Sequence, residues 1–529
     1  MENTELPIGD IVTSWAKERP DALLASFVSI APDGGFEDEA LTWGMLERNA
    51  MALAGWLQSI GIGKGDPVAI MLQNHPEFIE MMVATAFLGA VYVPIDPRST
   101  GDKLVYMLEF TACKALILGD YAAQLVLDVE PRLGALKNVL LVGTLPQLPE
   151  TRQSWIQYDA ALAGAVPLAA PEKIAQGDPL FMMFTSGTTG NPKAVVRSHA
   201  SHLRDYKLLL GLGIDPSYRL YTGLPLCHVN AQYILNIAMR RGQHMVFSRK
   251  FTKTRMLDIC RAYDCQTFSL LGGMTPEFFS NPPRVDDKGN PVKLVISSGM
   301  PAALWDAYRE RYGVQITELY GSTEGGGVLI NHHSEGPIGS VGRPPKGIVA
   351  EILDDSDNPV PDGTQGHICF RYEDRGPDPV EYLHNEKASA EKVSGGWFRS
   401  GDIASRDADG WYWFHHRVGG GVRRNGEFVN TYLVESVLSK HPGVADVFAY
   451  GVATPETVAG EKTLVAALVL EPGAETEKIA EWARSELQKN EVPAIWQVLD
   501  EIPKTISEKP IERLCIDLLK DSGLVDVAR

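Results

Sequence analysis

The sequence predicts an α/β protein with a large N-terminal domain and a small, mobile α+β C-terminal domain. The chain of 529 residues is too long for one hydrophobic core. From residue 40 to about residue 330, short β-rich runs alternate with helical patterns, which is typical of layered α/β subdomains with largely parallel sheets. After residue 335, glycine, proline and short strands indicate a β-rich subdomain.

The expected strands and helices follow the chain in alternation. Apolar and β-branched runs predict strands at 67–72, 90–95, 115–118, 139–142, 180–184, 244–247, 265–271, 292–296 and 315–319. Amphipathic patterns predict helices at 46–60, 231–241, 253–263 and 302–312. The small domain is expected to contain a helix at 433–440, strands at 444–452 and 463–470, and a helix at 476–489. We therefore place the domains at residues 1–417 and 418–529, with Gly419–Gly421 as a hinge.

Composition argues against several partners. The 49 basic and 67 acidic residues give a net charge of -18, which repels nucleic acid and anionic membranes. The longest uncharged stretch, 81–95, is interrupted by Gly89 and Pro94 and is shorter than the roughly 20 residues of a membrane-spanning helix. It predicts a buried helix, a turn and a strand, without membrane insertion.

Cysteines, histidines and the N-terminus predict a reduced cytoplasmic protein without a dedicated metal cluster. The acidic start lacks a signal-peptide pattern, and the six scattered cysteines form no Cys-x-x-Cys unit. Two adjacent histidine pairs, His332-His333 and His415-His416, are interpreted as packed or solvated residues, because neighbours in sequence rarely share one face.

Residues 185–193, Thr-Ser-Gly-Thr-Thr-Gly-Asn-Pro-Lys, follow the apolar run 180–184 and predict a phosphate-binding loop. Glycines let the backbone approach an anion, hydroxyls donate hydrogen bonds, and the lysine adds a positive charge. The Walker loop is excluded because Gly-Lys-Ser/Thr is absent, and the remaining alternative is an ordinary polar turn. The candidate residues are Thr185, Ser186, Gly187, Thr188, Thr189 and Lys193.

A second motif, Tyr-Gly-Ser-Thr-Glu at 320–324, ends another expected strand. Tyr320 is suited to stack on a purine beside Gly321, Thr323 to bind a phosphate, and Glu324 to hold Mg²⁺. Each of these signals is weak by itself.

Two further segments complete a candidate nucleotide site. Gly299 and Met300 follow the expected strand 292–296, and the glycine lets a flat ring lie against the backbone. Asp402 lies after a tight turn and can accept both hydroxyls of a ribose, while Arg417 can reach ribose or phosphate oxygens.

These motifs together resemble the adenylate-forming superfamily of acyl-CoA synthetases, peptide-synthetase adenylation domains and luciferases. The resemblance extends from Leu41-Thr-Trp to the C-terminal tail, and the order of the motifs makes it specific. It implies that a carboxylate attacks the α-phosphate of ATP to give acyl-AMP and pyrophosphate, and that a thiol then displaces AMP. The implied cofactors are ATP, Mg²⁺ and CoA.

The tail Pro-Lys-Thr-Ile-Ser-Glu-Lys at 503–509 resembles the family's terminal motif. The match implies that Lys509 bridges the substrate carboxylate and the α-phosphate, with Lys504 as the local competitor and a solvated lysine as the alternative. Thr188, Glu324 and His228 are the other expected catalytic residues.

The chain also departs from the family's pattern. Glu508 replaces a common glycine, Gly419 replaces a common charged residue, and Leu433 replaces a common glutamate. These departures concern the expected movement of the small domain and leave the chemistry of the large domain unchanged.

The acyl pocket is expected beside the segment 224–232, which resembles the crotonobetaine/carnitine-CoA ligase-like branch. His228 is placed between acid and thiol, with a packed histidine as the alternative. An α-amino acid is disfavoured because residues 216–256 contain no carboxylate to pair with its ammonium. Glycine-rich walls leave space for a bulky acyl group or only reflect turns; the pocket candidates are His228, Gln232, Gly272, Gly273, Met274, Gly325, Gly326 and Gly327.

For the thiol, the resemblance implies that Arg423, Arg424 and Gly426 line the CoA site, with a solvated basic hairpin as the alternative for the arginines. The expected function is an ATP-dependent acyl-CoA ligase. Two alternatives stay open: an enzyme that loads a separate carrier protein, and an ATP-binding homologue without turnover. A homodimer is also left open.

Overall fold

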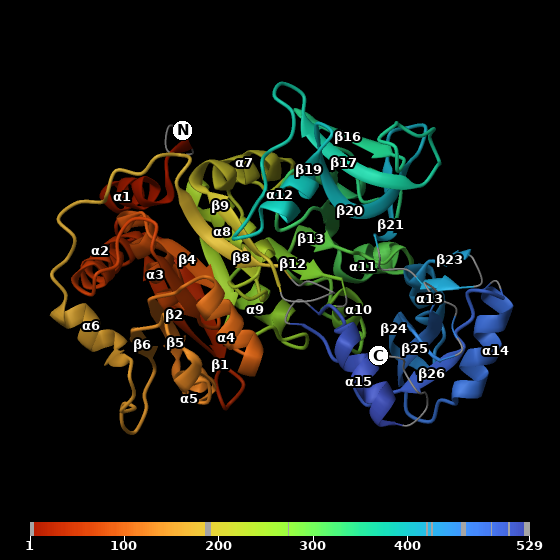
Figure 1. Cartoon of the computed structure of the whole chain (residues 1–529), viewed down its shortest axis with the longest axis horizontal. Coiled ribbons are helices and arrows are strands. Elements are labelled where there is room, and N and C mark those ends of the chain that lie inside the picture. The colour runs from red at the N-terminus through yellow and green to blue at the C-terminus, as the bar shows by residue number, and fades with distance from the viewer. Residues whose placement is uncertain are drawn as a thin grey trace. The chain divides into compact units, whose positions relative to one another are not determined.

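The structure is a computed structural model that describes residues 5–185, 192–272, 274–418, 422–424, 427–455, 457, 462–487, 489–505 and 508–522. It divides into two compact units (Figure 1). Unit 1 contains Met1–Gly339 and Asp378–Val393, and unit 2 contains Ser340–Pro377 and Ser394–Arg529. The predicted boundary between residues 417 and 418 separates two domains that are expected to move relative to each other. Compact units do not report such movement, so this boundary stays a prediction. Gly419–Gly421 lie outside the described residues.

The first sheet of unit 1 is parallel at its centre and antiparallel at both edges. Apolar strands of this kind are buried on both faces, which explains their near-continuous hydrophobic runs. In spatial order its strands are β15 (Leu329–Asn331), β14 (Gln315–Tyr320), β13 (Leu294–Ser298), β12 (Thr267–Leu271), β10 (Leu220–Thr222), β11 (Met245–Ser248), β1 (Leu23–Ile30) and β2 (Phe36–Thr42).

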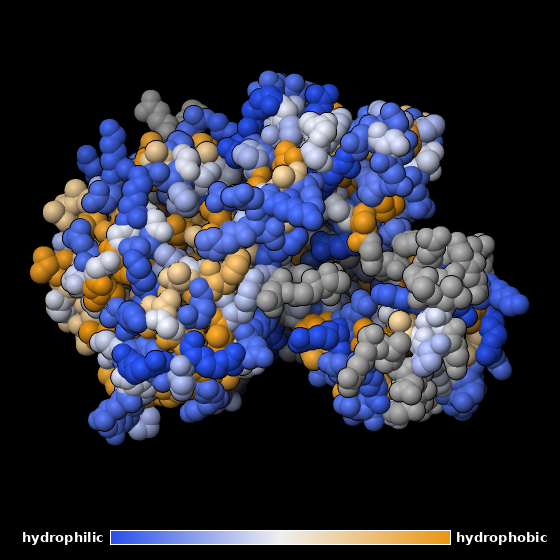
Figure 2. Space-filling model, in the orientation of Figure 1, coloured by the Kyte–Doolittle hydropathy of each residue, from blue (hydrophilic) through white to orange (hydrophobic). Residues whose placement is uncertain are grey.

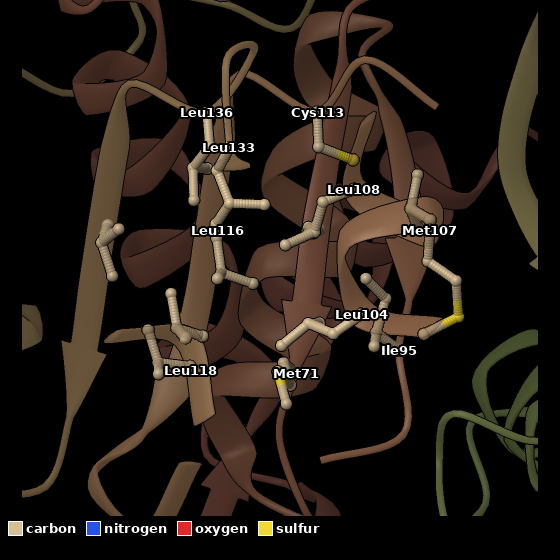
Figure 3. Packing of buried hydrophobic residues seen from close by; sticks show 14 of the residues in the cluster. Met71, Ile95, Leu104, Met107, Leu108, Cys113, Leu116, Leu118, Leu133 and Leu136 are labelled. Atoms are coloured by element: carbon tan, nitrogen blue, oxygen red, sulfur yellow. The ribbon is translucent and has the colours of Figure 1, made fainter. Parts of the chain in front are cut away.

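The second sheet of unit 1 has the same design, with the antiparallel strands at one edge. In spatial order its strands are β18 (Glu381–Tyr382), β9 (Ala194–Ser198), β8 (Pro179–Phe184), β4 (Val91–Pro94), β3 (Pro67–Met71), β5 (Ala115–Gly119), β6 (Asn138–Val142) and β7 (Ser154–Gln157). Leu104 and Leu108 of a covering helix pack against Met71, Leu116 and Leu118 of this sheet (Figure 3). The layered, largely parallel α/β architecture is confirmed.

Helices cover the sheets of unit 1. They are α1 (Ile8–Glu18), α2 (Trp43–Ser59), α3 (Pro76–Leu88), α4 (Gly101–Phe110), α5 (Ala123–Leu127), α6 (Tyr158–Gly164), α7 (His199–Leu209), α8 (Val229–Arg241), α9 (Met256–Ala262), α10 (Met274–Phe279), α11 (Trp305–Tyr312) and α12 (Glu386–Lys392). The stretch 81–95 forms the end of α3, a left-handed turn at Gly89 with φ 68°, and β4, as predicted. In the described part of the chain, no helix is both long and apolar enough to cross a membrane.

Unit 2 contains both a β-rich part and a small α+β part; the sequence predicted these two parts, but assigned the β-rich part to the large N-terminal domain. The β-rich part contains β16 (Ile348–Leu353), β17 (Gly366–Tyr372), β19 (Val393–Ser394), β20 (Trp397–Arg406) and β21 (Tyr412–Arg417). The α+β part contains β22 (Val422–Arg424), β23 (Glu427–Val429), α13 (Thr431–Leu438), β24 (Val444–Val452), β25 (Thr463–Leu470), α14 (Thr476–Glu486), β26 (Ile495–Val498) and α15 (Glu512–Asp521).

Polar residues cover most of the visible surface of each unit, and apolar residues form small scattered groups there (Figure 2). Five of the six cysteines are buried, and no disulfide joins the cysteines, all of which lie in described segments. The thiols therefore act as packing groups in the cores.

Candidate active site

Apart from the phosphate-binding loop, which follows β8 of the second sheet, the predicted binding segments of unit 1 follow four neighbouring parallel strands of the first sheet, β10, β12, β13 and β14. The carboxyl ends of parallel strands meet at one edge of a sheet, and that edge is where open α/β sheets bind ligands. Four loops leave this edge. With the adjoining ends of strands and helices, they carry His228 and, within α8, Gln232; Gly272 and, at the start of α10, Met274; Gly299 and Met300; and Tyr320 at the end of β14, with Gly321, Thr323 and Glu324.

The backbone at Gly299–Met300, where a flat ring is expected to lie, is hydrogen-bonded to a buried carboxylate. The backbone N–H groups of Gly299 and Met300 both donate to Glu318 of β14, the second at 3.2 Å. Glu318 is 4% exposed, and burial raises the pKa of its carboxyl from the ordinary 4.5 to about 7. Gly299 has a φ of +103°, and a Cβ there would crowd the backbone of Gly272. Glu318 thus fixes the loop on which a flat ring is expected to lie.

A buried arginine hydrogen-bonds to the turn that contains Glu324. Arg197 of β9 donates to the Glu324 carbonyl and to the Asp205 carboxylate, the latter at 2.6 Å. The side chains of Arg197 and Asp205 are 7% and 9% exposed. Gly325 has a φ of +77°, and a Cβ there would meet the Arg197 guanidinium. Both the backbone conformation of the turn and the position of Arg197 therefore require a glycine at 325. For this residue, the alternative that glycine reflects a backbone turn applies.

The side chain of Glu324 faces a tyrosine and a lysine. The Tyr382 hydroxyl donates to Glu324 Oε1 at 2.6 Å, and Lys392 Nζ lies 3.9 Å from the same oxygen. Burial and the neighbouring carboxylate raise the pKa of Tyr382, so its hydroxyl keeps the proton that it donates. A carboxylate oxygen in this position suits Mg²⁺, which proteins usually hold by one or two carboxylates together with substrate phosphates.

The stem of the predicted phosphate-binding loop is a hairpin of β8 and β9. Thr185 N–H donates to the Lys193 carbonyl at 2.9 Å, and the Lys193 ammonium lies 5.0 Å from the centre of the Tyr382 ring. Tyr382 thereby connects this stem to Glu324. The remaining loop candidates, Ser186, Gly187, Thr188 and Thr189, lie outside the described residues.

The acyl-pocket candidates have different local environments. His228 caps α8, and its Nδ1 accepts from Asn230 N–H at 3.2 Å, which leaves Nε2 to carry the proton of the neutral ring. Gln232 is buried; it donates to the Leu226 carbonyl at 2.7 Å and accepts from the Tyr92 hydroxyl at 3.2 Å. The roles of these two residues in acid binding stay predictions.

The glycine-rich walls are only partly described. A Cβ at Gly272 would have open space around it, whereas Met274 is buried at the start of α10. Gly326 and Gly327 are buried, and Gly273 lies outside the described residues.

In unit 2, the two predicted ribose residues lie opposite each other across a ladder. Asp402 of β20 is paired with Arg417 of β21, and Arg417 Nε lies 3.3 Å from Asp402 Oδ1. Asp402 is 5% exposed, and its N–H donates to Ser400 Oγ at 3.0 Å. The pair presents a carboxylate and a guanidinium together, which suits the hydroxyls of a ribose.

Lys509 is an exposed residue on a short turn of unit 2. Its carbonyl accepts from Thr505 N–H at 2.8 Å, and its own N–H donates to Thr505 Oγ1 at 3.2 Å. The neighbouring Glu508 has a φ of 57°, in the left-handed region that favours glycine, which explains why glycine is common there in the family. Lys504, the local competitor, pairs with Asp446 at 2.6 Å.

The predicted CoA residues lie in and beside the β22–β23 hairpin. Arg424 donates to the carbonyls of Asn490 and Val492, at 3.2 and 2.7 Å. Arg423 is in β22, and Gly426 lies outside the described residues. Their contact with CoA stays a prediction.

The expectation that adjacent histidines do not share a face is wrong for one pair. His332 and His333 do share a face, with ring centres 3.8 Å apart, because His333 adopts a left-handed conformation with φ 47°. Among the residues that the structure describes, no group of three histidine, cysteine or carboxylate side chains could hold a metal ion.

Family models match nearly the whole chain. The model described as AMP-binding enzyme matches residues 12–374, and the model of the AMP-binding enzyme C-terminal domain matches residues 433–509. The chain belongs to the AMP-binding enzyme family. The resemblance to the adenylate-forming superfamily is thereby confirmed.

Relatives of this AMP-binding enzyme include two curated proteins. FadD17 of Mycobacterium marinum, a medium/long-chain-fatty-acid–CoA ligase, is 30% identical over 488 residues, which cover 90% of this chain and 92% of the relative. Long-chain fatty acid transport protein 1 of Mus musculus is 30% identical over 78% of this chain and 68% of its own length. A crystal structure of the anthranilate CoA ligase AuaEII with anthranoyl-AMP has the same fold, with a TM-score of 0.83, 21% identity, and coverage of 99% of this chain and 100% of that chain.

The sequence did not point to four residues that contact the candidate site of this AMP-binding enzyme: Arg197, Glu318, Tyr382 and Lys392. The only charged residue of β14, two positions before Tyr320, was a usable signal for Glu318, because alternate residues of a strand share a face. No comparable signal pointed to Tyr382 and Lys392, which meet Glu324 only through the pairing of β18 with β9.

Proposed function

We propose that this AMP-binding enzyme is an ATP-dependent acyl-CoA ligase. It activates a carboxylic acid as acyl-AMP with release of pyrophosphate, and then transfers the acyl group to CoA with release of AMP. The observation that carries the proposal is the placement of Glu324 and the loops at 299–300 and 320–323 at one sheet edge, in a family of AMP-binding enzymes. The activity of the Mycobacterium marinum relative supports CoA as the acceptor.

The first step needs positive charge, because a carboxylate approaches the polyanionic triphosphate. Glu324 would hold Mg²⁺, whose positive charge would offset part of the negative charge of the triphosphate. Lys193 places a second cation near the ring of Tyr382, the tyrosine whose hydroxyl donates to Glu324. We assign Lys509 to the substrate carboxylate and the α-phosphate, and Asp402 with Arg417 to the ribose.

The acid is proposed to be a monocarboxylic acid without an α-ammonium group. The segment 216–256, which contains β10, α8 and β11, has no carboxylate to pair with a buried ammonium. Fatty acids, named for the mycobacterial relative, and aromatic acids, named for the anthranilate ligase, are the two classes to test first. The crotonobetaine/carnitine-CoA ligase-like branch, a cytoplasmic location and a homodimer stay predictions.

Acid-dependent exchange of labelled pyrophosphate into ATP tests the first step without any thiol. We expect exchange above background with at least one acid of a panel that contains saturated fatty acids of different chain lengths and benzoates. Exchange without subsequent acyl-CoA formation would favour a separate carrier protein as acceptor. Background exchange with every acid, while ATP still binds, would favour the homologue without turnover.

A further inference from the structure

We propose that Lys392 is a second lysine of the triphosphate site, which binds the β- and γ-phosphate oxygens of ATP and the oxygens of pyrophosphate. This inference rests on the proposed function, because it assigns a residue of the same site. Neither the phosphate-binding loop nor the Tyr-Gly-Ser-Thr-Glu motif contains this lysine.

The first observation is the position of the Lys392 ammonium. Lys392 is the last residue of α12, and its Nζ lies 3.9 Å from Glu324 Oε1. The side chains of Lys392 and Glu324 are only 16% and 13% exposed. The Tyr382 hydroxyl reaches the same carboxylate oxygen at 2.6 Å. The ammonium therefore lies beside the oxygen that is proposed to bind Mg²⁺, in a place shielded from water.

The second observation is that the backbone holding Lys392 is well supported. Asn385 caps α12 by accepting from Ala388 N–H at 3.0 Å. One turn into the helix, Ser389 accepts from Tyr382 N–H at 2.9 Å. Strand β18 and helix α12 are thus tied together, so that Tyr382 and Lys392 approach Glu324 from one connected element.

A third observation is that one lysine lies near the Tyr382 ring and another near the carboxylate that this tyrosine contacts. Lys193 approaches its ring at 5.0 Å, and Lys392 approaches the carboxylate to which its hydroxyl donates. One carboxylate needs only one cation for neutrality. Two lysines near the Tyr382–Glu324 pair, with Mg²⁺ if Glu324 holds it, would suit a ligand that brings several negative charges, as a polyphosphate does.

Charge balance indicates how Lys392 acts. Without nucleotide, Lys392 compensates the charge of Glu324 in a mostly buried place, where an unpaired charge is costly. Mg²⁺ held by Glu324 would place a second positive charge close to the Lys392 ammonium. Two cations at this place would favour the anionic oxygens of a polyphosphate. Lys392 would then offset charge on the pyrophosphate leaving group.

Equilibrium binding separates this role from a structural one. Isothermal titration calorimetry would measure the affinities of the wild type and of Lys392→Met for magnesium pyrophosphate, MgATP and AMP. Lys392→Gln serves as a second variant that lacks the charge. We expect roughly tenfold to hundredfold weaker binding of magnesium pyrophosphate and MgATP. Binding of AMP, which has no β- or γ-phosphate, should change less than about twofold.

Two further variants serve as controls. Lys392→Arg keeps the charge and should retain most of the affinity for magnesium pyrophosphate. Lys387→Met removes a lysine of the same helix whose side chain is 89% exposed, and it should bind all three ligands as the wild type does. The proposal would be overturned if both charge-free variants bound AMP and magnesium pyrophosphate more weakly by the same factor. It would also be overturned if neither variant changed the affinity for magnesium pyrophosphate.

These measurements use neither an acid nor a thiol, so their outcome is independent of the acyl-CoA ligase activity. A selective loss of magnesium pyrophosphate binding in an enzyme that activates no acid would support Lys392 and contradict the proposed function. The reverse pattern, acid activation with unchanged pyrophosphate binding in the variants, would contradict only the role of Lys392.

Discussion

Glu324 in unit 1 and Lys509 in unit 2 are the two charged residues on which the proposed reaction depends most, and their surroundings differ. The Glu324 side chain is 13% exposed, receives a hydrogen bond from Tyr382, and belongs to a turn clasped by Arg197. Lys509 is exposed on a turn whose bonds run between Thr505 and Lys509. The proposed metal-binding carboxylate thus lies in a mostly buried place, whereas the proposed catalytic lysine is on an exposed turn. Substitutions near Glu324 should affect stability and binding together, while substitutions at Lys509 should affect only chemistry.

The largest effect is expected for Lys509→Ala. Removing an electrostatic partner of the reacting groups should slow acyl-AMP formation by about a thousandfold. Thioester formation from supplied acyl-AMP should be retained, because that step does not need the positive charge between carboxylate and phosphate. The two half-reactions are measured separately by pyrophosphate exchange and by acyl-CoA formation.

Lys504→Ala is the matched control for Lys509→Ala. Lys504 lies on the same turn and pairs with Asp446, so its loss should leave both half-reactions near wild-type rates. Equal loss of both half-reactions in Lys509→Ala, or a larger loss in Lys504→Ala, would contradict the assignment of Lys509.

The second-largest effect is expected for the buried ion pair of Arg197 and Asp205. Arg197→Met leaves the Asp205 carboxylate buried without its partner, and should lower the free energy of unfolding of unit 1 by at least about 3 kcal/mol. Lys504→Ala breaks a pair that is 22% and 34% exposed, and should cost less than about 1 kcal/mol. Urea unfolding measures both variants. Similar losses would mean that the two regions do not differ in the way we describe.

The buried carboxyl of Glu318 should make the stability of unit 1 depend on pH. Because its folded pKa of about 7 lies above the ordinary 4.5, the folded state retains a proton that the unfolded chain releases. This contribution is fully present below pH 4.5 and is lost as the pH rises through about 7. Between these limits, the wild type should lose about 3 kcal/mol relative to Glu318→Gln. Urea unfolding of both proteins at pH 4.5 and pH 8 tests this, and parallel pH profiles would contradict it.

The smallest effect concerns Glu508. Its φ of 57° strains any residue with a Cβ, so Glu508→Gly should be more stable than Glu508→Ala by about 1 kcal/mol. Thermal unfolding of unit 2 measures the difference. A more stable alanine variant would contradict the left-handed conformation of this turn.

Much of the fold was predictable because parallel strands and amphipathic helices leave periodic patterns. Strands such as β5 and β12 and helices such as α8 and α14 lie where their patterns indicated. The binding loops were also predictable, since they directly follow such strands. Antiparallel edge pairing was not, because β18 has two residues and carries no periodic signal.

The contacts of the site were harder to predict than its motifs. Arg197 reaches Glu324 across 127 positions, and Tyr382 reaches it across 58. Such contacts depend on how two sheets and α12 meet, and a single sequence records no trace of that arrangement. The sequence pointed to Gly325 as a pocket residue, but in the structure the space where its side chain would lie is filled by the Arg197 guanidinium.

The central claim is the acid-dependent formation of acyl-CoA, and AMP release in the presence of CoA tests it most directly. The purified protein would be incubated with ATP, Mg²⁺ and a panel of fatty and aromatic acids, with and without CoA, and AMP and acyl-CoA would be quantified. The account predicts that at least one acid gives AMP and acyl-CoA in equal amounts, and that omission of CoA stops turnover after acyl-AMP. AMP release that is the same with and without CoA, or no acyl-CoA with any acid, would contradict it.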